Sequence, residues 1–196
     1  MHYSDTPNIT LRDPLAELLG AGEEPFVYTF NDAVKLAGHA CPTVAGAFLM
    51  IRRAMELLYP GTMPIRGDVL ITVPNRIEEG VTGPITQIFT LVSGAAGLNG
   101  FKGLAGQHNR MNLMRFQEGM GSAAPFVFEA ISTGRKVALV YSPAAIPPDP
   151  RMGEIMPLVL SNRAMPELRA EFGRLWRQRV EAILADGGTS TVTQVG

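Results

Sequence analysis

The segment from residue 43 to residue 58 has the apolar pattern that most restricts how this chain can fold. Its apolar side chains recur at spacings of three and four residues: Val44, Ala47, Phe48, Ile51, Ala54, Met55 and Leu58. This spacing predicts an amphipathic helix whose apolar stripe faces a core. Proline is favoured at the first helical position, so we expect Pro42 to begin the helix and Cys41 to cap it. The small residues 45–47 would allow another backbone, a flat cofactor or a partner helix to approach closely, although ordinary helix-on-sheet packing explains them as well.

Further elements follow from similar patterns. The apolar run at 68–73 predicts a strand buried in a sheet, and the β-forming run at 26–30 either adds a strand or only leads into the next helix. Two strands joined by a hairpin turn are expected at 124–131 and 136–141, and helices at 14–19, 31–37, 43–58, 83–94, 152–160 and 166–185. This order predicts an α+β fold, in which a mixed or antiparallel sheet is packed by helices and a helical segment is appended at the C-terminus.

The same patterns divide the chain into four parts. Residues 1–25 are expected to form an N-terminal arm with a short helix, and residues 26–145 an α+β domain. A stiff, proline-rich connector opens the helical extension at 146–187, whose last helix either closes over the sheet or forms a homodimer interface. The short polar end at 188–196 predicts a flexible tail.

Composition limits the classes of function. The chain has 196 residues, of which 46% are hydrophobic, so it can bury a sizeable core. Its 17 basic and 18 acidic residues give a net charge of −1, which shows no footprint for nucleic acid or an anionic membrane. One cysteine excludes an intrachain disulfide, and no apolar run reaches the roughly 18 residues of a membrane span. We expect a cytoplasmic protein, a homodimer, that binds neither nucleic acid nor membrane.

The only cysteine of the chain lies two residues after a histidine, in the run Gly38-His39-Ala40-Cys41-Pro42. The free amides and positive dipole at a helix N-terminus favour a thiolate, which makes Cys41 a better nucleophile or metal ligand. His39 can direct an imidazole to the same place, and this pair of ligand types suits zinc or a haem iron. The alternative is that Cys41 is a small buried apolar residue and His39 a structural one.

This run resembles the opening of the FmdE-like family of formylmethanofuran dehydrogenase proteins, whose members carry His-x-Cys-Pro at this point and are associated with a metal, usually zinc. A second, weaker similarity is Gly106-Gln107-His108-Asn109, where the family has a glycine-rich turn. The resemblance covers about residues 30–141 and implies that His39 and Cys41 are ligands. The further cysteines of the family are missing here, so any additional ligand must be His108, Glu79, a methionine or water.

Several residues therefore become candidates for a site. The proposed metal ligands are His39, Cys41 and His108, the additional candidates are Glu79, Met111 and Met114, and the loop expected to approach a ligand contains Gly103, Gly106 and Asn109. Glycines let a backbone approach a ligand closely, and methionine sulfur can ligate haem iron, although it more often fills a core.

Three functions remain open. The first is a metal-binding protein with a zinc ion at the Cys/His site and an open position for water or a small ligand, for which enzyme activity is undecided. The second is a haem-binding sensor or carrier that uses Cys41, His39 or a methionine as axial ligand. The third is an accessory or scaffold protein whose metal motif has decayed.

Overall fold

The computed structural model describes residues 3, 6, 8–21, 24–121 and 123–196, so the predictions for the rest of the N-terminal arm and for residues 22–23 lie outside the described residues. The helices are α1 (Pro14–Leu18), α2 (Phe30–Ala37), α3 (Pro42–Leu58), α4 (Thr82–Ser93), α5 (Pro150–Leu160) and α6 (Pro166–Asp186), with a 3-10 turn, η1 (Pro143–Ala145). The strands are β1 (Ile9–Leu11), β2 (Phe26–Tyr28), β3 (Val69–Val73), β4 (Met114–Phe116), β5 (Phe126–Ala130), β6 (Lys136–Tyr141) and β7 (Val192–Val195).

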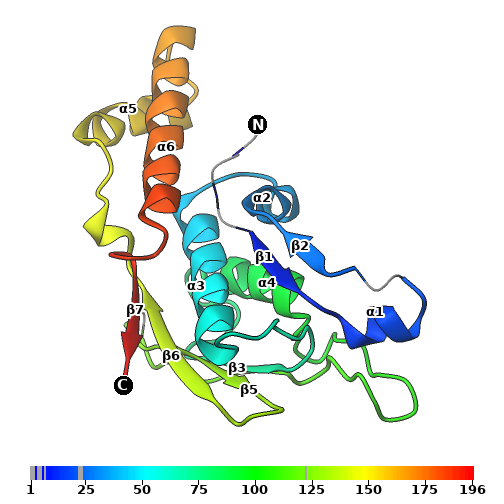
Figure 1. Ribbon diagram of the computed structural model, residues 1–196. Coiled ribbons are helices and arrows are strands. Elements are labelled where there is room, and N and C mark those ends of the chain that lie inside the picture. Colours follow the sequence, from blue (N-terminus) through cyan, green and yellow to red (C-terminus); the bar gives the residue numbers. More distant parts are fainter. Residues whose placement is uncertain (1–2, 4–5, 7, 22–23, 122) are drawn as a thin grey trace.

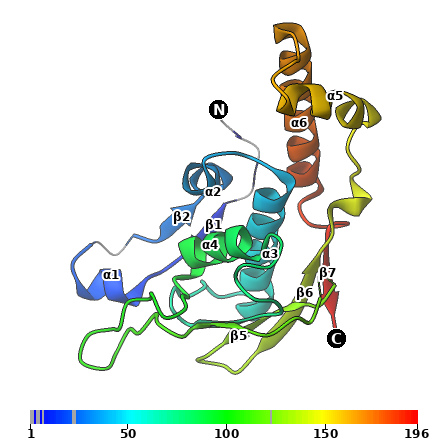
Figure 2. The ribbon, with the colours of Figure 1, turned by 180° about the vertical axis from the view of Figure 1, so that it is seen from behind.

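The main sheet has five strands in the order β4-β3-β5-β6-β7. Strand β3 pairs in parallel with β4, and the other neighbours are antiparallel, so the sheet is mixed. Figures 1 and 2 show α3 and α4 between this sheet and the two-stranded sheet of β1 and β2. The predicted α+β class, with helices packed on a mixed sheet, is confirmed.

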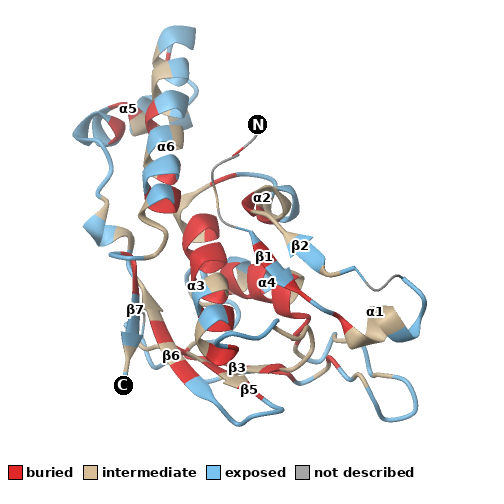
Figure 3. Cartoon of the chain, viewed as in Figure 1, coloured by how far each residue is buried: buried red, intermediate tan, exposed pale blue. Residues whose placement is uncertain are grey.

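Helix α3 is the centre of the core. Its apolar stripe is buried as the spacing predicts, and Phe48, Ile51 and Ala54 are fully inaccessible to solvent. Figure 3 shows the buried residues concentrated on α3, α4 and the strands beneath them. Strand β3 alternates fully buried residues with partly exposed ones, because one face of the sheet lies against the helices.

Both ends of the chain pair with or pack against the rest of the fold more extensively than their sequences predict. Strand β1 pairs with β2, and Leu11 is fully buried in the main core, so this part of the N-terminal segment is no separate arm. The predicted flexible tail at 188–196 is wrong, because β7 pairs antiparallel with β6 and buries Val192. A strand of four residues gives little periodic signal, and its partner lies more than 50 residues earlier in the chain.

The C-terminal helices form a hairpin that projects from the body (Figures 1 and 2). Met152 and Ile155 of α5 and Leu175 of α6 make a small apolar cluster of their own. The last turns of α6 instead belong to the main core, through Val180 and Ile183. In the part of the chain that the structure describes, no helix has the length and apolar character to cross a membrane.

Candidate functional site

Cys41 is the N-cap of α3, and Pro42 begins the helix, as the sequence predicts. The backbone of Cys41 is extended, and its Sγ accepts a hydrogen bond from the backbone N–H of Val44 at 3.4 Å. The side chain is partly buried against the main core. A sulfur that accepts from the first turn of a helix replaces the oxygen of an ordinary capping residue.

Two aromatic side chains donate hydrogen bonds to the backbone carbonyls on either side of Cys41. The indole Nε1 of Trp176, on α6, donates to the carbonyl of Ala40 at 2.8 Å. The hydroxyl of Tyr141, at the end of β6, donates to the carbonyl of Pro42 at 2.7 Å. Burial raises the pKa of Tyr141, so its hydroxyl keeps the proton that it donates. The motif is thereby held by the sheet and by the C-terminal helix together.

Gly46 explains how Tyr141 comes so close to α3. A Cβ added at Gly46 would lie 2.2 Å from Cζ of the Tyr141 ring, so only glycine leaves room for the ring. The close approach expected at residues 45–47 is therefore made by an aromatic ring of the sheet.

His39 follows the end of α2, where Gly38 is in the left-handed conformation with φ of 75°. Its Nδ1 lies 2.9 Å from the carbonyl oxygen of Ala37. A carbonyl can only accept, so this contact is a hydrogen bond when Nδ1 carries the proton, which leaves the lone pair on Nε2. The side chain is exposed.

Two cavities lie on either side of the motif. The first, which we call the His39 groove, has a volume of about 660 Å³ and lies between α2 and the C-terminal helices; it is lined by His39, Val34, Met156, Leu160, Phe172 and Trp176, among others. The second, which we call the Thr82 cavity, has a volume of about 530 Å³ and lies where α3 and α4 begin; its polar lining includes Thr43, Asn75, Glu79, Thr82 and Tyr141. Thus His39 faces one cavity, and Thr43 and Tyr141, which neighbour Cys41, face the other.

The structure places His108 away from the motif. Two residues further along, Arg110 binds Asp13 at the start of α1 with a distance of 2.6 Å between Nη2 and Oδ1. Figures 1 and 2 show the loop after α4 beside α1, whereas Cys41 lies at the start of α3, on the side of α6. The structure therefore does not bring His108 to His39 and Cys41. Across the described ranges, no three His, Cys, Asp or Glu side chains gather closely enough to hold a metal ion.

The glycine-rich loop is folded on itself. A Cβ at Gly103, where φ is 88°, would lie 2.2 Å from the carbonyl oxygen of Gln107, so this glycine closes a tight turn. Gly106 also has a positive φ of 81° but faces open space. The side chain of Asn109 donates to the carbonyl of Met111 at 2.7 Å and accepts its N–H at 3.1 Å. These bonds give the loop residues a structural role.

The other candidate ligands are dispersed. Met114 lies on β4, is 5% exposed, and belongs to the main core. Met111 is in the loop that precedes β4. Glu79 is partly buried in the turn that leads into α4, where it lines the Thr82 cavity. Of these three candidates, Glu79 lines the same cavity as Thr43, which lies two residues after Cys41.

Similarity to other proteins adds nothing to this geometry. Comparisons with protein-family models, with curated proteins and with solved structures find no match. The resemblance to the FmdE-like family thus remains an expectation, and the function must be inferred from the site itself.

A cluster of buried, charged side chains lies outside the motif. Arg110 and Arg66 both bind Asp13, and the Arg110 and Asp13 side chains are each 6% exposed. Burial raises the pKa of Asp13, but Arg110, a hydrogen bond from Arg66 and the N–H of Leu15 outweigh it, so the pKa lies below its ordinary value. Sequence reasoning missed this cluster, because its members are up to 97 residues apart.

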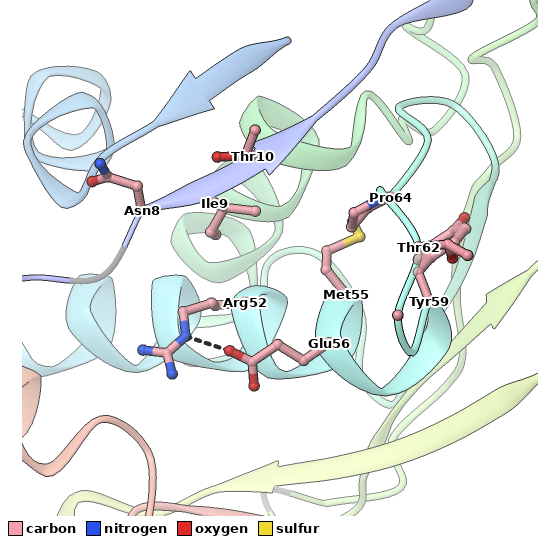
Figure 4. Close-up of a pocket in the computed structure, with 10 residues that line it drawn as sticks. Asn8, Ile9, Thr10, Arg52, Met55, Glu56, Tyr59, Thr62 and Pro64 are labelled. Atoms are coloured by element: carbon pink, nitrogen blue, oxygen red, sulfur yellow. Dashed lines mark hydrogen bonds and ion pairs between the residues drawn. The ribbon is translucent and has the colours of Figure 1, made fainter.

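A smaller cavity of about 320 Å³ lies between β1 and α3. Figure 4 shows Arg52 and Glu56 at its edge, and Nε of Arg52 lies 2.8 Å from Oε1 of Glu56. The two side chains are one turn apart on α3 and form an ion pair at the edge of this cavity.

Proposed function

We propose that this chain is a metal-binding protein in which Cys41 and His39 supply two ligands, with zinc as the preferred metal. The observation that carries the proposal is the hydrogen bond between Nδ1 of His39 and the carbonyl of Ala37. Histidine ligands to metals usually donate their other ring N–H to a carbonyl or carboxylate, which fixes the tautomer and the ring orientation. His39 is thus held with Nε2 available for a metal.

The alternation of burial along the motif also supports a shared site. His39 is exposed, Ala40 is 7% exposed, and Cys41 is partly exposed. In an extended backbone, residues two apart lie on the same side of the chain. Cys41 is extended, so this alternation favours an arrangement in which His39 and Cys41 lie on the side opposite Ala40.

Two protein ligands leave the remaining positions of a tetrahedral ion to water or a small ligand. A zinc ion with open positions supplies Lewis-acid chemistry to whatever binds there. The role of this chain would be to hold the ion through Cys41 and His39 while Trp176 and Tyr141 fix the backbone on either side of Cys41.

A titration of the purified protein with Co²⁺ tests this proposal, because cobalt bound to a thiolate gives a charge-transfer absorption band. We expect the band in the wild type, its loss in C41S, and at least a tenfold weaker titration in H39Q. The matched control is H108Q, which changes the same residue type at a place remote from the motif and should titrate like the wild type. A wild type without the band, or a C41S variant that keeps it, would contradict the proposal.

The His39 groove favours haem binding as a second candidate. Its walls are almost entirely apolar, and its volume of about 660 Å³ suits a flat apolar cofactor. His39 would offer Nε2 as an axial ligand, and Met156 lines the same groove, whereas Met111 and Met114 lie elsewhere. No pattern in the sequence distinguishes Met156 from a methionine that fills a core.

Adding hemin to the purified protein tests this second candidate. A Soret band shifted from that of free hemin, formed at one hemin per chain and lost in H39Q, would support it. An unshifted spectrum, or one unaffected by H39Q, would reject His39 as a haem ligand.

A further inference from the structure

Strand β4 leaves one edge of the main sheet open. It is the outermost strand on its side of the sheet and pairs in parallel with β3. Gln117 donates its N–H to the carbonyl of Val73 in β3 at 2.9 Å, so the backbone of Gln117 faces β3. The N–H and C=O groups of successive residues point to opposite sides of a strand, and Phe116 therefore directs both of its groups away from β3.

The neighbouring backbone bonds agree with this direction. Met114, two residues before Phe116, also directs its N–H away from β3, where it donates to the carbonyl of Ala96 at 3.0 Å. At Phe116 neither the N–H nor the C=O has a hydrogen-bond partner among the described residues. An edge of this kind is a template for one more strand.

A hollow lies beside this edge, and we call it the β4 hollow. It has a volume of about 600 Å³ between α4, β4 and the loop that follows α4, and its lining includes Gln87, Leu91, Leu98 and Phe116. None of the described residues that line it is charged. Figure 2 shows α4 in front of α3, so this side of α4 is an outer face of the molecule.

Exposed apolar side chains surround the β4 hollow. Leu98 is 83% exposed, Ile77 is 57% exposed and Leu36 is 47% exposed, and all three line the hollow. Single exposed apolar residues are ordinary on a protein surface, but several around one uncharged hollow form a patch typical of an interface. The patch and the open edge of β4 adjoin each other at Phe116.

Three properties of this surface favour a second copy of the chain as its partner. A two-fold interface uses the same patch on both subunits, so charges near the axis would meet their own kind, and this patch has none. The surface carries both a projecting Leu98 and a hollow, so each copy can fill the other. The open edge can pair antiparallel with its own copy, whereas a small molecule in the hollow would leave the edge unpaired.

We infer that this chain forms a homodimer in which β4 pairs antiparallel with β4 of a second copy and joins the two five-stranded sheets into one. The N–H of Phe116 donates to the carbonyl of Phe116 in the second copy, and the reverse bond forms by symmetry. Leu98 of each copy enters the β4 hollow of the other, beside Gln87 and Leu91.

This interface differs from the one that the sequence pattern of the last helix suggested. The last turns of α6 pack into the main core of their own chain, through Val180 and Ile183. The inference uses neither His39 nor a metal, so it stands or falls independently of the proposed metal site.

Sedimentation velocity of the purified protein tests the inference. We expect a dimer in the wild type and a dissociation constant at least tenfold higher in L98E, which puts a charge into the uncharged hollow of the other copy. The matched control is L160E, because Leu160 is 74% exposed but lies on α5, in the C-terminal helices. L160E should form a dimer as tight as the wild type.

Hydrogen exchange of the Phe116 amide, followed by NMR, tests the strand pairing itself. We expect this amide to be protected in the wild-type dimer and to exchange rapidly in L98E. Circular dichroism of L98E checks that the variant is folded, and L98A, which adds no charge, provides a second variant if it is not.

Four results would overturn the inference. They are a monomeric wild type, a folded L98E variant that dimerises like the wild type, a wild-type dimer in which the Phe116 amide exchanges rapidly, and a dimer that L160E dissociates as effectively as L98E. The last result would place the interface on the C-terminal helices.

Discussion

The hydroxyl of Tyr141 donates a 2.7 Å hydrogen bond to the carbonyl of Pro42, which joins the end of β6 to the first turn of α3. The two residues are 99 positions apart, and the ring of Tyr141 occupies the space that Gly46 leaves on the helix. The position of the Cys41 motif therefore depends on the main sheet as well as on α3.

The first prediction concerns this contact. In G46A the new Cβ would overlap the Tyr141 ring, so the ring or the helix must move, and we expect the free energy of unfolding to fall by about 1–3 kcal/mol. The control G173A lies on α6, where a Cβ meets nothing within 4 Å. There alanine should stabilise the helix by about 0.5–1 kcal/mol. Urea denaturation measures both, and equal effects of the two substitutions would contradict the role given to Gly46.

The indole of Trp176 gives a second prediction. W176F keeps an aromatic ring but removes the donor to the carbonyl of Ala40, which is 7% exposed and part of the core. An acceptor left without a partner in a buried site costs about 1–3 kcal/mol, so we expect the free energy of unfolding to fall by that amount. W176F should also weaken Co²⁺ binding at the neighbouring motif. A variant as stable as the wild type would show that this bond does not hold the motif.

The elements with a strong periodic pattern could be predicted from the sequence. The stripe of α3 and the apolar run of β3 are local signals, and Pro42 and Cys41 mark the helix start by their chemistry alone. Strand β4 could not be recognised, because it has only three residues and pairs in parallel with β3 across an intervening helix. Strand β7 has only four residues and takes its structure from pairing with β6.

Only those parts of the candidate site whose residues are close in the sequence could be predicted. His39 and Cys41 are two residues apart, so their proximity follows from the sequence itself. The sequence does not show that Arg110 binds Asp13, and this long-range pair holds the His108 loop beside α1.

A third prediction concerns pH. Because the pKa of Asp13 lies below its ordinary value in the folded chain, its contribution to stability is complete above about pH 4 and is lost as pH falls through the lowered pKa. D13N should lower the free energy of unfolding at pH 7 by about 3–5 kcal/mol, since it leaves Arg110 buried without its partner. It should also flatten the decline of stability between about pH 5 and pH 2, which denaturant melts across that range measure.

The control for that prediction is E17Q. Glu17 also pairs with an arginine, Arg12, at 2.6 Å, but both side chains are substantially exposed. Solvent screens such a pair, so E17Q should change stability much less than D13N at pH 7. Similar losses in the two variants would show that burial does not set the strength of the Asp13 cluster.

A fourth prediction tests the last strand. Deleting residues 192–196 removes the buried Val192 and the hydrogen bonds of β7 to β6, and should lower the free energy of unfolding by about 2–4 kcal/mol. Q194A keeps the strand and changes only an exposed side chain, so its effect should stay within about 0.5 kcal/mol. Denaturant melts of both variants distinguish a paired β7 from a tail that contributes nothing to the free energy of unfolding.

The central claim is that Cys41 and His39 bind a metal. The most direct measurement is the zinc and iron content of freshly purified wild type and C41S, with the visible spectrum recorded on the same samples. We predict a colourless wild type with about one zinc per chain and a C41S variant with none. A wild type with neither metal, or a C41S variant with as much zinc as the wild type, would contradict the claim and favour an accessory or scaffold role.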